Sequence, residues 1–149
     1  MASKCAPTAY IAASWKHEHA VKMMTDLLRE IGVEVRSFVE NGYKEHSGAV
    51  FEPDGKKMDF DEWVLTDKGT RSFEFDVNGA TTSDFVLYIG PSGTDAWAEV
   101  GAAWSAGVPV LGLWAKGEPA GLMRLMMMAW YTDHRQMLRH IKAVFVVRP

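Results

Sequence analysis

The sequence contains a single cysteine, Cys5, among 149 residues. One cysteine cannot form an internal disulfide bond, and it cannot supply the cysteine ligands of a structural zinc site. The sequence therefore excludes a disulfide-stapled scaffold. A reducing compartment is the simplest expectation, and we predict a cytoplasmic protein.

The chain also lacks an excess of positive charge and any long apolar run. Its 16 Lys and Arg residues against 19 Asp and Glu residues give a net charge of −3, so nothing favours binding to a nucleic acid polymer. Apolar stretches such as residues 125–131 are far shorter than the ~20 residues of a membrane-spanning helix. Residues 5–15 loosely imitate a signal peptide, but Pro7 and Ser14 interrupt them. We predict neither a membrane segment nor a targeting signal.

The composition predicts one folded domain over residues 1–149. Apolar residues make up 48% of the chain and charged residues 23%, close to the averages of globular proteins. A chain of this length has room for a single well-buried core.

Strand and helix patterns alternate along the chain. Short apolar runs predict strands at residues 8–13, 33–39, 84–89, 108–114 and 126–130. Amphipathic or capped segments predict helices at residues 17–31, 60–65, 68–80, 94–105 and 133–141. This alternation predicts an α/β fold with a mostly parallel five-stranded sheet that helices cover on both faces.

Two segments have a less clear pattern. Residues 40–59 form the longest irregular stretch and contain several turn signals, and loops of this length are usually functional or mobile. Residues 122–130 suit a helix by propensity and a buried strand by their lack of a polar face. The Met-rich run from residue 122 to 131 also suits a contact surface between subunits.

Glu99 is the foremost candidate for chemistry. In such sheets ligands bind beyond the carboxyl ends of the strands, where residues 10–14, Asp76 and residues 90–103 should converge. Glu99 lies in the first turn or so of a predicted helix, whose N-terminus favours a charged carboxylate, while apolar neighbours limit its solvation. Such a carboxylate can attack an oxocarbenium-like carbon. The alternative is a Glu that merely complements the helix dipole.

Weaker candidates surround Glu99. Backbone N–H groups of residues 90–94 can cradle an anion, or the glycines there can simply meet the demands of a turn. Trp63 can stack on a base or pack in the core. His17 and His19 are two residues apart and share no helical face, so we predict no metal site.

Three segments together resemble the nucleoside 2-deoxyribosyltransferase family and its nucleotide N-glycoside hydrolase relatives. They are Tyr10-Ile-Ala-Ala-Ser14, Asp76 followed by Ser83-Asp84, and Gly93-Thr94 with Glu99-Val-Gly101-Ala-Ala103. The resemblance spans residues 10 to about 110. It implies a flavodoxin-like three-layer sandwich, no metal or organic cofactor, a small-molecule nucleoside or nucleotide partner, and a homodimer or higher homo-oligomer.

The resemblance also implies a reaction, the cleavage of the N-glycosidic bond of a nucleoside or nucleoside 5′-monophosphate. Glu99 would attack C1′ of the sugar and form a glycosyl–enzyme intermediate. Asp76 would protonate or orient the departing base, and Tyr10 would position the Glu99 carboxylate. Substrate contacts are expected at Ser14, Ser92, Gly93, Thr94 and Trp63, with the two serines placed where nucleotide-cleaving relatives hold the 5′-phosphate.

Two features depart from the family pattern. The spacer between Thr94 and Glu99 is longer than in the family signature. Transferases of the family also take an Asn from a neighbouring subunit near the C-terminus, and this chain has no Asn after Asn78. The second departure favours hydrolysis over base exchange.

Two alternative functions remain open. Trp97, two residues before Glu99, resembles the Trp-and-Glu helix of TIR-type NAD hydrolases, which implies release of nicotinamide from NAD. The domain can also be a non-catalytic nucleotide-binding module, since one fold hosts many functions. Release of nicotinamide from NAD, rather than of a base from a nucleoside or monophosphate, would indicate the first alternative. Nucleotide binding with the same base-release rate in Glu99→Gln as in wild type would indicate the second.

Overall fold

A computed structural model describes residues 5–114, 118–119 and 121–147 of the chain. Five parallel strands form its main sheet: β1 (Thr8–Ala13), β2 (Glu34–Arg36), β6 (Phe85–Ile89), β7 (Val110–Leu113) and β8 (Ala129–Tyr131). Their order across the sheet is β2-β1-β6-β7-β8. Numbered along the chain within this sheet, that order is 2-1-3-4-5, the flavodoxin-like arrangement. The predicted fold class is confirmed.

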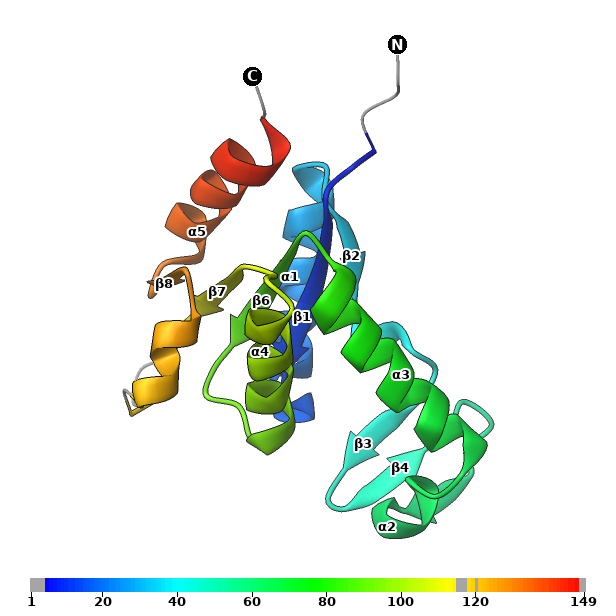
Figure 1. Cartoon of the computed structure of the whole chain (residues 1–149). Coiled ribbons are helices and arrows are strands. Elements are labelled where there is room, and N and C mark those ends of the chain that lie inside the picture. Colours follow the sequence, from blue (N-terminus) through cyan, green and yellow to red (C-terminus); the bar gives the residue numbers. More distant parts are fainter. Residues whose placement is uncertain (1–4, 115–117, 120, 148–149) are drawn as a thin grey trace.

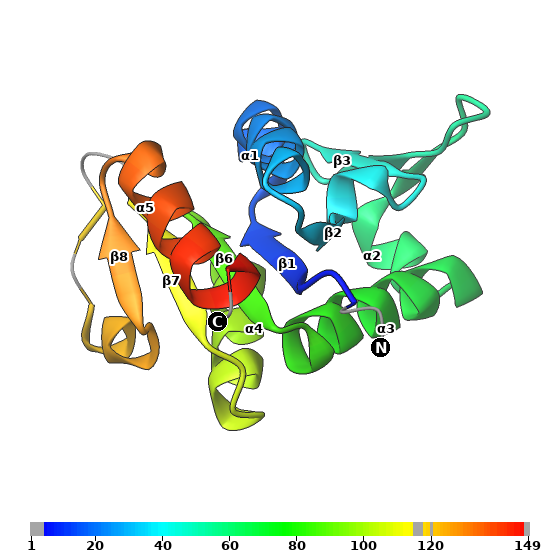
Figure 2. The ribbon, with the colours of Figure 1, turned by 90° about the horizontal axis from the view of Figure 1, so that it is seen from above.

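Helices cover both faces of this sheet (Figures 1 and 2). One layer holds α1 (Glu18–Glu30) and α5 (His134–Ile141), and the other holds α3 (Asp67–Thr82) and α4 (Thr94–Ser105). Successive residues of β1 point to opposite faces, so Ile11 packs into the α1–α5 core and Tyr10 into the α3–α4 core. Burial on both faces explains why β6 and β7 have no charged residues, whereas the edge strand β2 has two.

Short helical turns complete the chain and shift some predicted boundaries. They are η1 (Trp15–His17), η2 (Phe38–Glu40), α2 (Phe60–Trp63), η3 (Leu122–Met126) and the π-helical η4 (Lys142–Val146). The second strand ends at Arg36 rather than at residue 39, because Phe38 turns into the core within η2. The fifth strand begins at Ala129 rather than at residue 126, after the exposed η3. None of the helices in the described residues is both long and apolar enough to cross a bilayer.

Residues 40–59, predicted to be irregular, form a second sheet. Its antiparallel strands are β3 (Lys44–His46), β4 (Ala49–Phe51) and β5 (Lys57–Asp59). Ser47 and Gly48 connect the first two strands with φ angles of 51° and 74°, as a tight two-residue hairpin turn requires. The prediction was wrong because strands of three residues are too short to display a two-residue period.

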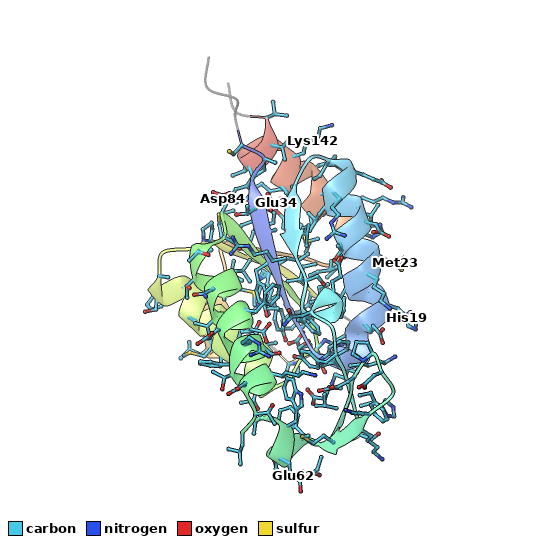
Figure 3. The ribbon with its side chains drawn as sticks, turned by 90° about the vertical axis from the view of Figure 1, so that its right-hand side faces the viewer. His19, Met23, Glu34, Glu62, Asp84 and Lys142 are labelled. Atoms are coloured by element: carbon cyan, nitrogen blue, oxygen red, sulfur yellow. The ribbon has the colours of Figure 1, made fainter. Side chains whose placement is uncertain are left out.

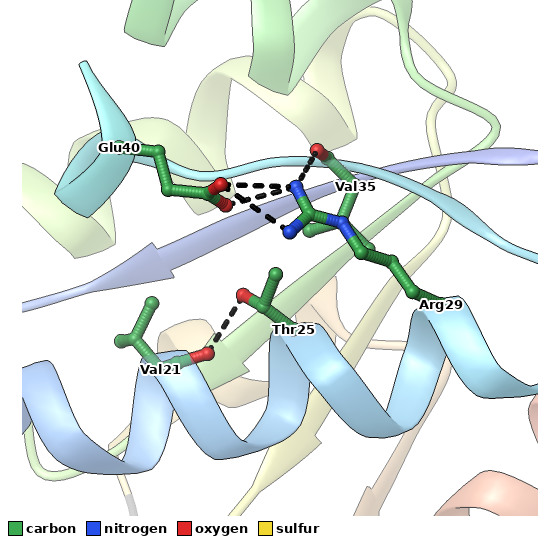
Figure 4. Close-up of polar contacts among 5 residues, drawn as sticks. All are labelled: Val21, Thr25, Arg29, Val35 and Glu40. Carbon is green, nitrogen blue, oxygen red and sulfur yellow. Dashed lines mark hydrogen bonds and ion pairs between the residues drawn. The ribbon is translucent and has the colours of Figure 1, made fainter.

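The second sheet lies beyond the carboxyl ends of the main strands. Figure 3 shows Glu34 and Asp84, at the start of β2 and β6, at one end of the molecule, and Glu62 of α2 at the other. The chain leaves the main sheet through η2, which α1 holds in place (Figure 4).

Arg29 of α1 makes that attachment. Its guanidinium donates to both carboxylate oxygens of Glu40, at 2.9 and 3.2 Å, and to the carbonyl of Val35 at 3.3 Å. Because the guanidinium contacts both carboxylate oxygens, the pair constrains the relative orientation of the two side chains in addition to the attraction between their charges. It therefore ties η2, the start of the connection to the second sheet, to α1 and to the end of β2.

Candidate active site

Two cavities meet beyond the carboxyl ends of β1 and β6. The first has a volume of about 360 Å³ and is lined by Ala13, Ser14, Trp15, Phe38, Tyr43, Glu45, Asp76, Gly93, Thr94, Asp95, Ala96 and Glu99. The second, of about 390 Å³, lies between α2, α3 and α4 and is mostly apolar. Both are lined by Tyr43, Glu45, Asp76, Asp95 and Glu99, so the carboxyl groups stand where the cavities join.

Glu99 faces both cavities from the second turn of α4, six residues after the N-cap Gly93. The longer spacer therefore keeps it directed at the site. The prediction that the helix end favours its charged form is wrong, because that effect fades within the first turn, where Asp95 lies. Burial raises the pKa of Glu99 to about 8, the charges of Asp76 and Asp95 add to the shift, and the Tyr10 hydroxyl opposes it.

Asp76 lies on α3 and lines the same two cavities. Burial raises its pKa to about 6, and the charge of Asp95 acts in the same direction. Asp76 Oδ1 and Glu99 Oε2 are buried and have no hydrogen-bond partner among the described residues. A bound ligand can supply those partners, since unpaired buried oxygens are rare in folded proteins.

Tyr10 stands behind the two carboxyl groups. It is fully buried, and its hydroxyl has no partner within hydrogen-bonding distance among the described residues. Burial, followed by the charges of Glu99 and Asp76, raises the pKa of its hydroxyl well above the ordinary value, so Tyr10 remains a neutral donor. Gly79 of α3 makes room for the ring, because a Cβ there would lie 2.4 Å from Tyr10 Cδ2.

The arrangement can perform paired acid and nucleophile chemistry. Glu99 and Asp76 interact, so their two protonation steps belong to the pair. Between about pH 6 and pH 8 the pair holds one proton, which leaves one carboxyl group as an acid and the other as a nucleophile. Carboxyl pairs of this kind cleave glycosidic bonds. Among the described residues, no group of three or more His, Cys, Asp or Glu side chains is arranged to hold a metal ion.

The other predicted substrate contacts fall in different places. Ser14, Gly93 and Thr94 line the first cavity, and Trp63, only 4% exposed, lines the second. Ser92 lines neither of them. Its hydroxyl accepts the Ser14 N–H at 2.9 Å and donates to the Ile89 carbonyl at 2.6 Å. Ser92 therefore ties the ends of β1 and β6 together.

Sequence reasoning missed several lining residues: Trp15, Phe38, Tyr43, Glu45 and Asp95. Asp95 could have been found, because it precedes Glu99 by four residues and so shares its helix face. Tyr43 and Glu45 lie in or beside the second sheet, which had been read as irregular. Nothing in a stretch without visible periodicity indicates which side chains face the site.

Solved structures that share this fold include two enzymes. A 2-deoxyribosyltransferase of Bacillus psychrosaccharolyticus superposes with a TM-score of 0.71 at 21% identity, covering 95% of this chain and 98% of that chain. The CMP N-glycosidase BcmB of Clostridium botulinum gives 0.56 at 14% identity, covering 91% and 98%. A conserved protein of Enterococcus faecalis V583 gives 0.61 at 13% identity, covering 93% and 98%.

Sequence comparisons give no match. No protein-family model matches the chain, and no curated protein sequence matches it significantly. At the identities above, the structural similarity establishes the fold, which agrees with the fold that the sequence resemblance implied.

Proposed function

We propose that this protein belongs to the nucleoside 2-deoxyribosyltransferase family and cleaves the N-glycosidic bond of a nucleoside or nucleotide. One observation carries the proposal: Glu99 and Asp76 both face the place where the two cavities join, and the buried Tyr10 lies close to both of them. Two solved structures of the same fold are enzymes whose names refer to this chemistry, which supports it.

The reaction follows from the two carboxyl groups. When substrate binds, the one proton that the pair holds passes from Glu99 to Asp76. The ionised Glu99 then attacks C1′ as the C1′–N bond breaks, and the base leaves with the proton of Asp76. Water then attacks C1′, returns a proton to Asp76 and releases Glu99, so the products are a free base and a free sugar. The Tyr10 hydroxyl, which has no partner among the described residues of the free protein, donates to the ionised Glu99 once substrate is bound and holds it in line. Positive charge at C1′ stabilises the ionised nucleophile.

Each cavity binds one part of the substrate. The first takes the sugar beside Ser14, Gly93 and Thr94, and the second takes the base against Trp63 and Tyr43. Ser92 contributes by fixing Ser14. We propose hydrolysis rather than base exchange. In the family's transferases an Asn near the C-terminus reaches into a neighbouring subunit and contacts the bound sugar, and this sequence has no Asn after Asn78.

The NAD-hydrolase alternative receives no support from geometry. Trp97, which suggested it, packs on Tyr88 with ring centroids 4.8 Å apart. It lines neither of the two cavities.

A base-release assay tests the proposal. Purified protein is incubated with ribonucleosides, deoxyribonucleosides, their 5′-monophosphates and NAD, with and without an acceptor base, and free base is followed by chromatography. We expect Glu99→Gln to lower release by more than about 100-fold, while Glu74→Gln on the exposed side of α3 leaves it unchanged. Equal release by Glu99→Gln and wild type, or no release from any compound, contradicts the proposal and indicates a binding module.

A further inference from the structure

Within the described part of the chain, the titratable acidic and basic side chains that line the two cavities are all acidic. Four acidic side chains line the two cavities: Glu45, Asp76, Asp95 and Glu99. No Lys, Arg or His among the described residues lines either one. Lys44, adjacent to Glu45 in the chain, pairs with Glu18 at 2.9 Å, and Lys68 pairs with Glu52 at 2.7 Å. Burial and the charge of Asp95 raise the pKa of Glu45 as well, as expected where no cation compensates.

Three donors that could hold a phosphate at the strand ends are already engaged. The Ser14 N–H donates to Ser92 Oγ at 2.9 Å, and the Ser92 N–H donates to Tyr88 Oη at 3.1 Å. The Ser92 hydroxyl donates to the Ile89 carbonyl at 2.6 Å. The first turn of α4, the other anion-binding element here, already has the carboxylate of Asp95. An incoming phosphate finds these donors of Ser14 and Ser92 occupied. At the start of α4 it meets the like charge of the Asp95 carboxylate.

Aromatic rings complete the walls. The rings that line the cavities are those of Trp15, Phe38, Tyr43, Phe60, Trp63 and Phe73. Tyr43 stands between Trp15 and Trp63, at centroid distances of 5.5 and 4.6 Å. Aromatic faces attract cations, and the same rings stack on flat heterocycles. Trp63 Nε1 is buried without a hydrogen-bond partner among the described residues, so a base that has a carbonyl oxygen could supply the missing acceptor.

We propose that this site selects its substrate by charge: it rejects a 5′-phosphate, and it prefers a nucleoside with a positively charged base over the uncharged analogue. The inference rests on the proposed function only for the identity of the ligand as an N-glycoside. Its physical basis is the carboxylate set without a cation, the engaged donors at Ser14 and Ser92, and the aromatic walls.

Matched ligands test both halves of the proposal. Nicotinamide riboside is a cation, its dihydro form is uncharged and nearly isosteric, and its 5′-monophosphate adds only the phosphate. Dissociation constants are measured by calorimetry at pH 7 and low salt in Glu99→Gln. The substitution stops turnover, and the amide resembles the protonated carboxyl group that prevails in the free protein at this pH.

We expect the riboside to bind at least about tenfold more tightly than the dihydro form and than the monophosphate. Adding Glu45→Gln or Asp95→Asn should reduce both ratios several-fold, whereas adding Glu74→Gln on the exposed side of α3 should not. Equal or tighter binding of the monophosphate, equal binding of the dihydro form, or no binding of any of the three overturns the inference.

Base release by the wild-type protein separates the two proposals. The predicted order of affinities without any release leaves the charge selection standing and contradicts the enzymatic proposal. Release from monophosphates as fast as from nucleosides contradicts the charge selection alone.

Discussion

Replacing Glu99 by Gln should stabilise the folded protein while abolishing its activity. Folding raises the pKa of this carboxyl from its ordinary value of 4.5 to about 8. The folded state therefore binds the proton more tightly than the unfolded chain does. The stability that this proton contributes is complete below pH 4.5 and is lost as the pH rises through about 8.

The size of the effect follows from the same shift. Each pH unit between the two pKa values corresponds to about 1.4 kcal/mol, so ionisation of the unfolded chain costs the folded state about 3 kcal/mol at pH 7. Partial exposure of the side chain reduces this to about 2 kcal/mol. Gln is neutral at every pH, so the cost disappears in the variant. For a chain of this length, the melting temperature should rise by roughly 5 °C.

Urea unfolding of both proteins from pH 4 to pH 8 measures the difference directly. The free energies of unfolding should agree near pH 4 and diverge as the pH rises, with the variant more stable. Glu74→Gln on the exposed side of α3 serves as the control and should show no such divergence. A variant that is less stable at pH 7, or a difference that does not change with pH, would refute the reasoning.

Three further predictions concern the same site. Base release should depend on pH as a bell with limbs near 6 and 8, because the reactive form of the Glu99–Asp76 pair holds one proton; a pH–rate profile without an alkaline fall contradicts this. Gly79→Ala should slow base release by more than about tenfold by displacing Tyr10. Gly101→Ala is the control: its added Cβ meets nothing within 4 Å, so steady-state kinetics should give the wild-type rate of base release. Tyr10→Phe should keep the free energy of unfolding within about 1 kcal/mol of wild type, because its hydroxyl has no partner, yet lower base release; strong destabilisation in urea would count against this.

The main fold was accessible from the sequence because its strands are buried on both faces. A run such as Phe85–Ile89 has no polar residue, and the flanking helices show their own period, so element order and strand pairing follow from general rules. The second sheet was not accessible. Each of its strands has three residues, and its pairing depends on the hairpin turn at Ser47 and Gly48 rather than on a hydrophobic pattern.

The sequence predicted which residues lie together at the candidate site better than it predicted their electrostatics. Motif spacing indicated Tyr10, Asp76 and Glu99, and the structure brings these three side chains together. The direction of the Glu99 pKa shift was predicted wrongly, because it depends on burial by elements far apart in the chain. Local helix position alone cannot supply that information.

The second sheet has a consequence for how such a protein can change over evolution. The groups proposed for bond cleavage come from β1, α3 and α4 of the main layers, whereas Tyr43, Glu45 and Trp63 come from residues 41–66, one continuous insertion between β2 and α3. Lengthening or replacing a segment between two fixed elements costs little free energy, because the entropy of loop closure changes slowly with length. Under the proposed function, exchange of this one segment would alter which base is accepted and leave Glu99 and Asp76 unchanged. A chimera with junctions at residues 41 and 66 would reproduce that exchange experimentally.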